Sequence, residues 1–370
     1  MKYIGRKTLA LVFALATALS VFLTSGRSET VLCLAEADIP EYVSVSGGDF
    51  KVSSRFWELF VGKNKNDEKT VLIPGGMVFG ARVKQTCVTV QDVGGHTDVK
   101  SGDKLLKING KRIESARDVK DILSLADGTP LTLTLERGGE SFDVKLVPRE
   151  EDGEYKLGLG LKDGAAGIGT ITYIDPETGA FGGLGHGICD SESGEVIEIS
   201  SGAVTGVILG GTKKGEAGKP GELSGILTDK CIGTVYANTP CGVFGVIDKL
   251  PDSNSCVSIP VGKRSEVHTG SAVIYSTVKN GKTRQFDIEI TEVDTDSHGT
   301  KSFKIKVTDP ALIAITGGIV RGMSGSPIIQ DGKLIGAVTH VMVADPTEGY
   351  GIFIENMLSA AEQQVQPKAA

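Results

Sequence analysis

The stretch GGIVRGMSGSPIIQDGKLIGAVTH, residues 317–340, places a glycine-framed serine between two apolar segments. Its centre, Gly322-Met-Ser-Gly-Ser-Pro327, predicts a tight turn, because glycine adopts backbone angles that other residues avoid. The run Leu334–Thr339 that follows predicts a buried β-strand. The segment therefore indicates a serine hydroxyl presented at a sharp turn within β-structure.

This turn resembles the G-x-S-G-x-P motif of serine peptidases with the chymotrypsin barrel fold. The resemblance implies that Ser324 is the nucleophile and that the backbone N–H groups of Gly322 and Ser324 form the oxyanion hole. Gly325 would relieve crowding behind the nucleophile. Taken alone, the hexapeptide also fits a purely structural Gly–Ser turn, and Ser326 is the next candidate nucleophile.

A second motif, Phe181-Gly-Gly-Leu-Gly-His-Gly187, embeds a histidine in glycines. Glycines offer little apolar packing, so this histidine suits the edge of a cleft better than a core. We therefore expect His186 to be the general base. His340 ends the strand after Ser324 and is the rival candidate, but the order His before Ser is that of the barrel peptidases.

Upstream, the run GDKLLKINGKRI, residues 102–113, lies in a segment of short strands with one helix. Asn109-Gly110 predicts a hairpin turn, and Ser115 predicts the cap of a helix over about 116–125. This order of elements resembles a PDZ domain of the bacterial protease type, assigned to residues 71–150. The resemblance implies peptide binding at a glycine-flanked loop, placed at Gly76, Met77, Val78, Phe79 and Gly80. A PDZ-like structural spacer is the alternative.

Residues 165–365 predict a mainly β peptidase domain. About ten short apolar runs alternate with turn residues there, which favours a sandwich or a pair of barrels. Asn280-Gly281 predicts one of the hairpins. A C-terminal helix is expected over residues 354–364. With the resemblance of the serine turn to barrel peptidases, the expected fold class is mainly β, a PDZ domain followed by a chymotrypsin-like double β-barrel.

The N-terminus carries Lys2, Arg6 and Lys7 before the uncharged run Thr8–Ser25. This pattern predicts a signal peptide or membrane anchor over residues 1–30, with a linker over 31–70 outside the cytoplasm.

The formal net charge of −7 disfavours nucleic acid as a partner. The cysteine and histidine spacings match no zinc pattern, so we expect neither a metal nor a cofactor.

Together, GLGHGICD at residues 183–190 and the stretch from Thr308 to Ile352 resemble the SpoIVB family of sporulation peptidases. The resemblance implies a catalytic triad of His186, Asp309 and Ser324. Chemically, any nearby carboxylate could hold the base, and four others are available: Asp190, Asp229, Asp248 and Asp345.

The same resemblance implies a regulatory role for the peptidase. The expected substrate is the extracytoplasmic part of a membrane protein that restrains an intramembrane protease. Its cleavage, in the space between forespore and mother-cell membranes, would trigger processing of a sigma factor, and self-cleavage would accompany it. Met323 stands where digestive enzymes carry an aspartate that pairs with a new N-terminus. Activation by that ion pair is therefore excluded.

Two other functions remain open on the sequence. A PDZ adaptor without catalysis would bind a partner through the same domains, although the intact Ser–His pair disfavours it. A general extracytoplasmic quality-control peptidase would use the PDZ domain to sense misfolded chain ends. Broad cleavage of unfolded casein distinguishes the second function from cleavage of one partner.

Overall fold

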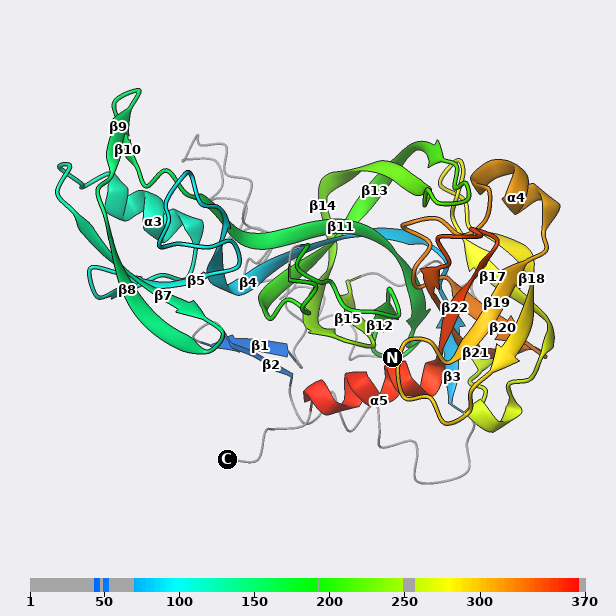
Figure 1. Cartoon of the computed structure of the whole chain (residues 1–370). Helices are drawn as coiled ribbons and strands as arrows, with labels where there is room; N and C mark the ends of the chain where they lie inside the picture. Colours follow the sequence, from blue (N-terminus) through cyan, green and yellow to red (C-terminus); the bar gives the residue numbers. More distant parts are fainter. Residues whose placement is uncertain (1–42, 47–48, 53–69, 192, 249–256, 366–370) are drawn as a thin grey trace, which may run out of the picture.

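The computed structural model describes residues 43–46, 49–52, 70–191, 193–248 and 257–365 of the 370-residue chain. The expected signal or anchor over 1–30 lies outside them. Within the described part, no helix is both long and apolar enough to cross a membrane. The chain is mainly β and forms three units. In space, a small unit lies beside the first barrel, and the second barrel lies on the other side of the first (Figure 1).

The first barrel closes because one long strand pairs with a neighbour on each side. Strand β11 is hydrogen-bonded to both β12 and β4, which completes a ring of six antiparallel strands. In order around the ring these are β11 (Gly160–Ile174), β12 (Ala180–Gly183), β15 (Gly242–Ile247), β14 (Glu222–Thr239), β13 (Ile199–Lys213) and β4 (Val78–Asp92). Its core includes Phe79 and Phe181, whose rings meet edge to face.

The second barrel is also closed and antiparallel. Its strands, in order around the barrel, are β17 (Gly270–Ser276), β18 (Arg284–Val293), β19 (Phe303–Val307), β22 (Glu348–Phe353), β21 (Lys333–Val341) and β20 (Pro327–Gln330). The hairpin between β17 and β18 turns at Asn280-Gly281, both with positive φ, as the sequence predicted. The double-barrel prediction is confirmed.

Helix α5 (Ile354–Val365) packs along the junction of the two barrels and matches the expected C-terminal helix. Its residue Met357 shares one apolar cluster with Tyr173 and Phe244 of the first barrel and with Leu334 and Ile352 of the second. The short strands β3 (Val71–Pro74) and β16 (Ile259–Pro260) lie at the same junction. The barrels are therefore joined by a continuous hydrophobic contact.

The small unit is inserted into the first barrel rather than placed before it. Strands β4 and β11 pair with each other along most of their length, so they leave the barrel together and enter the small unit (Figure 1). Its own core contains Val88, Val90, Leu105 and Leu133, whereas Phe79 to Val83 belong to the core of the barrel. Residues 71–83, which we expected to open the PDZ domain, thus pack and pair with the strands of the first barrel.

The remaining elements of the small unit follow the predicted order. They are β5 (Lys104–Ile108), β6 (Lys111–Arg112), α3 (Ala116–Leu123), β7 (Leu131–Arg137), β8 (Glu140–Leu146), β9 (Arg149–Glu151) and β10 (Glu154–Lys156). Ser115 caps α3 as expected, and Asp118 completes a capping box. Asp103 is buried and accepts two hydrogen bonds from Arg137, of 2.6 and 2.7 Å, which fixes the Gly102-Asp103 turn.

The loop Gly76–Gly80, expected to receive a peptide, lies at the contact between the barrels. The N–H of Gly76 donates to Ile171, and its carbonyl accepts from the Thr277 hydroxyl. Phe79 is fully buried. The Gly76 backbone groups are thus occupied by the fold, and Phe79 lies in the core of the first barrel.

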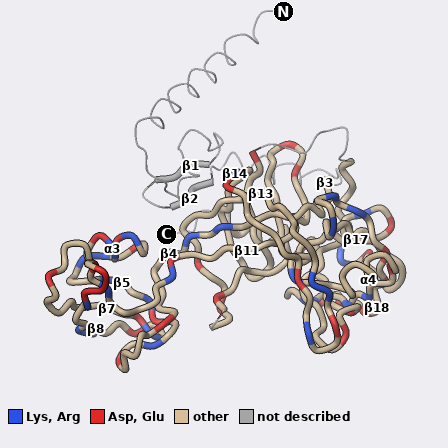
Figure 2. Tube along the Cα trace, turned by 90° about the horizontal axis from the view of Figure 1, so that it is seen from above, with Lys and Arg blue, Asp and Glu red and all other residues tan. Residues whose placement is uncertain are grey.

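Charged residues of both signs occur along the described part of the chain (Figure 2). Lys and Arg alternate with Asp and Glu over the small unit and the second barrel (Figure 2).

Candidate active site

Ser324 lies on a turn that precedes β20 and is held on both sides. The N–H of Gly325 donates to Val338 at 2.7 Å, and the N–H of Ser326 donates to Met323 at 2.9 Å. Gly325 has φ of +94°, and a Cβ there would lie 2.0 Å from the carbonyl oxygen of Thr170. Only glycine therefore fits behind the serine, as the motif predicted.

Two backbone N–H groups of this turn, those of Gly322 and Ser324, donate to no oxygen among the described residues. Unpaired N–H groups are uncommon inside proteins unless a ligand or water completes them. They are the two donors that the motif assigns to an oxyanion hole.

Two threonines of β11 form hydrogen bonds with the turn that carries Ser324, across the junction of the barrels. The Thr170 hydroxyl donates to the carbonyl of Gly322 at 2.7 Å, and the Thr172 hydroxyl donates to that of Gly325 at 2.8 Å. The N–H of Thr170 also donates to the carbonyl of Ser324. Both threonines are fully buried. Sequence analysis missed them, although hydroxyls at alternate positions of an apolar strand signal a polar contact inside the fold.

His186 follows β12 on a left-handed turn in which Leu184 and Gly185 have φ of 66° and 67°. Its Nδ1 lies 2.8 Å from the carbonyl oxygen of Gly187. A carbonyl only accepts, so the proton is on Nδ1 and the neutral ring keeps a lone pair on Nε2. Burial lowers the pKa of His186 below its ordinary value of 6.5, despite the opposing effect of this hydrogen bond. The ring is therefore a neutral base near neutral pH.

His340, the rival base, faces His186. The ring centroids are 5.3 Å apart. Burial, together with repulsion from His186 and Lys301, lowers the pKa of His340 to about 4. Its Nδ1 is buried and has no hydrogen-bond partner among the described residues. The structure thus brings both candidate bases to one place, and His186 is the one whose tautomer is fixed.

The hydroxyl of Ser324 donates to the carbonyl of Thr339 at 2.8 Å, the residue next to His340. Gly185 packs against Thr339 as well, since a Cβ on Gly185 would lie 3.0 Å from the Thr339 methyl group. The histidine loop of the first barrel and the serine turn of the second barrel therefore meet at Thr339. Catalytic hydrogen bonds are often formed only when substrate is bound, so the serine rotamer seen here is compatible with attack.

Among the described residues, Asp309 forms no hydrogen bond with His186 or Ser324. Its carboxylate caps α4 (Pro310–Thr316) by accepting from the N–H groups of Ala311 and Leu312, at 2.8 and 3.0 Å. It also accepts from Asp287. No carboxylate contributes to the pKa of His186. The expected contact between Asp309 and His186 is absent among the described residues, and the Nδ1–H of His186 donates to the Gly187 carbonyl.

Asn238 is a positioning residue that sequence analysis missed. Its side-chain oxygen accepts from the N–H of Ile188, and its amide donates to the carbonyls of Ile188 and Ile197, each at 2.8 Å. Asn238 is the next-to-last residue of β14, and these hydrogen bonds hold the segment that follows His186. A single asparagine at a strand end carries no distinctive pattern, so the sequence could not reveal it.

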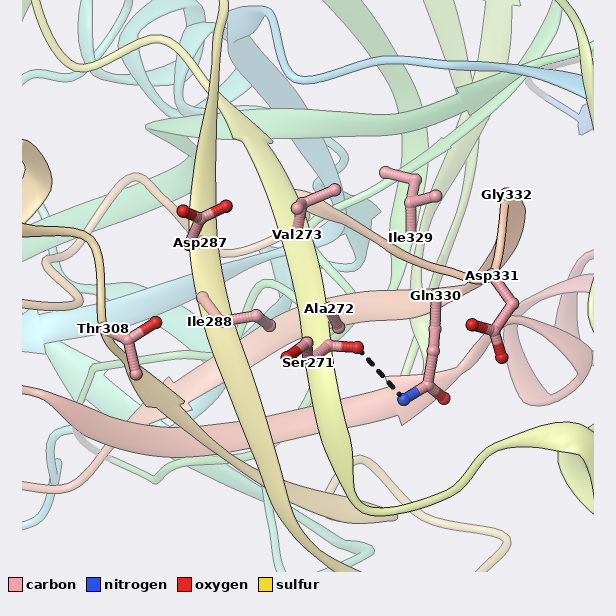
Figure 3. A pocket seen from close by; sticks show the side chains of 10 residues that line it. All are labelled: Ser271, Ala272, Val273, Asp287, Ile288, Thr308, Ile329, Gln330, Asp331 and Gly332. Atoms are coloured by element: carbon pink, nitrogen blue, oxygen red, sulfur yellow. Dashed lines mark hydrogen bonds between the residues drawn. The ribbon is translucent and has the colours of Figure 1, made fainter.

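Two pockets differ in their relation to the site. One of about 500 Å³ lies on the outside of the second barrel, between β17, β18 and the β20–β21 turn (Figure 3). It contains neither His186 nor Ser324. Another, of about 320 Å³, is bordered by His186 itself, with Ala81, Ile168, Leu184 and Ile188 forming apolar walls. The second pocket is positioned to receive an apolar side chain beside the base.

Alternatives to Ser324 in the described part would be a metal-binding cluster or a cysteine that acts as nucleophile. No group of three or more His, Cys, Asp or Glu side chains there is placed to hold a metal ion. Cys189 is exposed near the histidine loop, and, like Cys87, Cys231 and Cys241, it forms no disulfide within the described residues. Burial raises the pKa of the Cys189 thiol, which disfavours a thiolate nucleophile.

A histidine on one β-barrel and a glycine-framed serine on the next define a serine hydrolase of the double-barrel type. The family model described as SpoIVB peptidase S55 matches residues 153–358, more than half of the chain. The chain belongs to this family and is a serine endopeptidase. The structure extends the peptidase fold upstream of the match, since the first half of β4 builds the same barrel and β3 pairs with β11.

Other similarities cover smaller parts of proteins. A protein of Agrobacterium fabrum named as a candidate zinc metalloprotease is 28% identical over 128 residues, 33% of either chain. A similarly named protein of Rhizobium meliloti is 38% identical over 69 residues, 19% of this chain and 18% of its own. The chain thus spans a third or less of these relatives' length.

Two solved structures resemble the chain weakly. The inactive Ser343Ala mutant of Rv3671c from M. tuberculosis is 17% identical, with 55% of this chain and 84% of that chain covered and a TM-score of 0.32. The HtrA-type protease AlgW with a decapeptide is 12% identical, with 55% and 54% covered and the same TM-score of 0.32.

Proposed function

We propose that Ser324 is the nucleophile and His186 the general base of an acyl-transfer site. The observation that carries this proposal is the Nδ1–H···O contact of His186 with Gly187, which leaves Nε2 free to accept a proton. Ser324 Oγ attacks the peptide carbonyl carbon while His186 Nε2 takes its proton. The oxyanion is stabilised by the N–H groups of Gly322 and Ser324.

The second half of the reaction returns the proton. When the C–N bond breaks, Nε2–H of His186 protonates the leaving amine, and Ser324 carries the acyl group. Water then attacks the ester with His186 again as base, which releases the acid and restores the hydroxyl. The Gly187 carbonyl keeps the ring oriented throughout, the task that a carboxylate performs in a conventional triad.

The nucleophile is tested by Ser324→Ala with Ser326→Ala as the matched control. The Ser326 hydroxyl is fully buried and donates to the Ser276 hydroxyl, so it has no access to substrate. Ser324→Ala should lose self-cleavage and labelling by a fluorescent fluorophosphonate, a loss on the order of 10⁶ in turnover. Ser326→Ala should keep both. Labelling that persists in Ser324→Ala and disappears in Ser326→Ala would reverse the assignment.

We also propose limited proteolysis in sporulation signalling as the biological role. The substrate class is the extracytoplasmic segment of a membrane protein that restrains an intramembrane protease, and the location is the space between forespore and mother-cell membranes. Membership of the SpoIVB family supports this role. Peptide mapping of active and Ser324→Ala protein with candidate membrane partners tests it. Cleavage of casein at many sites would favour quality control instead, and absence of all cleavage would favour an adaptor.

The small unit is proposed to be a PDZ-like peptide-binding module whose loop is Leu157–Gly160 instead of Gly76–Gly80. The N–H groups of Gly158 and Leu159 donate to no backbone oxygen among the described residues. Gly158 is exposed, with φ of +70°. The loop opens onto the start of β11, and Asp163 of β11 accepts from the N–H of Ala116 at the start of α3. An extended peptide would lie between α3 and β11 with its carboxylate at this loop.

A further inference from the structure

The hairpin of β13 and β14 reaches from the first barrel onto the nucleophile turn of the second. Its tip is anchored there, because Gly215 donates to Thr316 and Gly218 donates to Val343, both at 2.8 Å. Where β14 begins, Glu222 forms a parallel bridge with Arg321. Two hydrogen bonds make this bridge: Leu223 N–H to the Arg321 carbonyl at 2.8 Å, and Arg321 N–H to the Gly221 carbonyl at 2.9 Å.

The first of these bonds fixes one particular peptide unit. The carbonyl of Arg321 and the N–H of Gly322 belong to the same planar trans peptide and point in opposite directions. When Leu223 holds the carbonyl on the side of β14, the N–H of Gly322 is turned to the other side. A half-turn of this peptide would exchange a hydrogen-bond donor for a carbonyl oxygen at the place where the oxyanion forms.

Other contacts favour the same orientation. Leu223 packs directly on Gly322, since a Cβ on that glycine would lie 3.1 Å from the Leu223 Cβ. Thr170 holds the Gly322 carbonyl on the far side of the residue. Met323 is fully buried in the core of the second barrel. Because Met323 cannot form an ion pair, the order of this turn must come from neutral contacts such as these.

We propose that the segment Gly221–Leu223 is an orienting clamp for the oxyanion hole, with the Leu223 N–H as its positioning group. In digestive enzymes an ion pair between an aspartate and the N-terminus orders the oxyanion hole. Here the clamp, which belongs to the first barrel, orders it instead. A displaced hairpin leaves Ser324 and His186 in place but lets the Arg321–Gly322 peptide turn away. This inference rests on the proposed oxyanion role of Gly322.

The direct test replaces the Leu223 N–H by an ester oxygen, with leucic acid incorporated at position 223 by nonsense suppression. Leucine delivered at 223 by the same suppressor is the control, so the side chain is unchanged. The measurement is the rate constant of fluorophosphonate labelling at saturating probe, because the phosphoryl oxygen occupies the oxyanion hole. We expect the rate constant to fall between about 10-fold and about 10³-fold, the latter being the loss of a whole oxyanion donor.

The amplitude of labelling separates this effect from misfolding. A clamp that only orients the hole lowers the rate constant while every molecule is finally labelled and the probe's apparent affinity is kept. A misfolded fraction lowers the amplitude at an unchanged rate. An ester variant that labels at the control rate overturns the clamp, whereas absence of labelling in the control would overturn the assignment of Ser324 itself.

A conventional pair of variants gives a second test. Arg321→Pro deletes the N–H that donates to Gly221, and Arg321→Ala removes the same exposed side chain but keeps that N–H. We expect Arg321→Ala to label within about twofold of wild type and Arg321→Pro to label more than about tenfold more slowly at full amplitude. Equal rates in the two variants would contradict the proposal.

Discussion

His186 and His340 face each other across the junction of the two barrels, with ring centroids 5.3 Å apart and ring planes inclined by 38°. Both imidazoles are partly buried, and burial lowers the pKa of each ring. Two neutral rings can share this space, but two imidazolium ions would repel each other with little solvent to screen them. The pair is therefore stable in the protonation state that a general base requires.

Activity should persist below the pH at which an ordinary histidine becomes protonated. The base works only when neutral, and the pKa of His186 lies below 6.5 because of burial. We expect the acid midpoint of the fluorophosphonate labelling rate to fall below pH 6.5. The check is a labelling profile from about pH 4 to pH 8, with Ser326→Ala showing the same midpoint as wild type. A midpoint at or above 6.5 would exclude His186, in this environment, as the base.

His340 should make the fold sensitive to acid. Its pKa is about 4 in the folded protein against 6.5 ordinarily, so the unfolded chain binds more protons between these values. Stability is therefore present above pH 6.5 and is lost as the pH falls towards 4. His340→Asn, which does not titrate, should flatten this dependence in urea unfolding. His268→Asn is the control, because the pKa of the exposed His268 is raised and its effect has the opposite sign.

Asn238 should couple stability to catalysis. Asn238→Asp keeps the size but removes the two N–H donors that bind the carbonyls of Ile188 and Ile197. The Ile197 carbonyl is then left unpaired, at a cost of about 1–3 kcal/mol, whereas the Ile188 carbonyl keeps the N–H of Ile197 as a donor. We expect a lower unfolding midpoint in denaturant and at least a tenfold slower labelling of Ser324, since the histidine loop loses its tether. A variant that is destabilised but labels at full rate would restrict Asn238 to a structural role.

Asp309→Asn distinguishes the helix cap from a triad acid. Asparagine caps helices about as well as aspartate, so the structure predicts activity within a few-fold of wild type. Asp309→Ala should cost about 1 kcal/mol of stability through the lost cap. A true triad acid would instead lose about 10⁴-fold on substitution by asparagine. Such a loss in kcat, with normal unfolding, would show that Asp309 reaches His186 in the working enzyme.

The peptide loop is tested by Gly158→Asp against Gly158→Asn. Both side chains tolerate positive φ, and a Cβ at Gly158 meets only the Nε2 of His96, at 3.5 Å. The two variants therefore differ only in charge. Using a peptide library with free C-termini as the probe, we expect Gly158→Asp to lose binding and Gly158→Asn to retain most of it. Equal binding by the two variants, or equal binding of C-terminally amidated peptides, would contradict carboxylate capture here.

The sequence predicted those features that depend on local chemistry. The Gly322–Pro327 turn, the Asn280-Gly281 hairpin and the Ser115 cap follow from backbone preferences of single residues. The number and spacing of apolar runs predicted a sandwich or a pair of barrels, and the resemblance of the serine turn to barrel peptidases pointed to the double barrel. These features need no knowledge of which distant strands pair.

The features that sequence analysis missed depend on long-range pairing. The segment Gly76–Gly80 has the composition of a peptide-binding loop, yet its partners Ile171 and Thr277 are 95 and 201 residues away. Asp309 precedes Pro310, which is as typical of a helix start as of a catalytic turn. Thr170 and Asn238 act through contacts with backbone atoms, and such contacts leave no residue pattern in the partner.

The insertion of the small unit makes the first barrel discontinuous along the chain, and this has a consequence for the order of assembly. Strand β4 is synthesised before the insert but pairs with β11 and β13 after it. The insert has its own core and can fold while the chain is still emerging, but the barrel cannot close until β15 has been made. The β13–β14 hairpin can form its hydrogen bonds with Arg321 only after the second barrel has been synthesised. Both barrels, and the contact between them, must therefore form before the serine and histidine loops can meet.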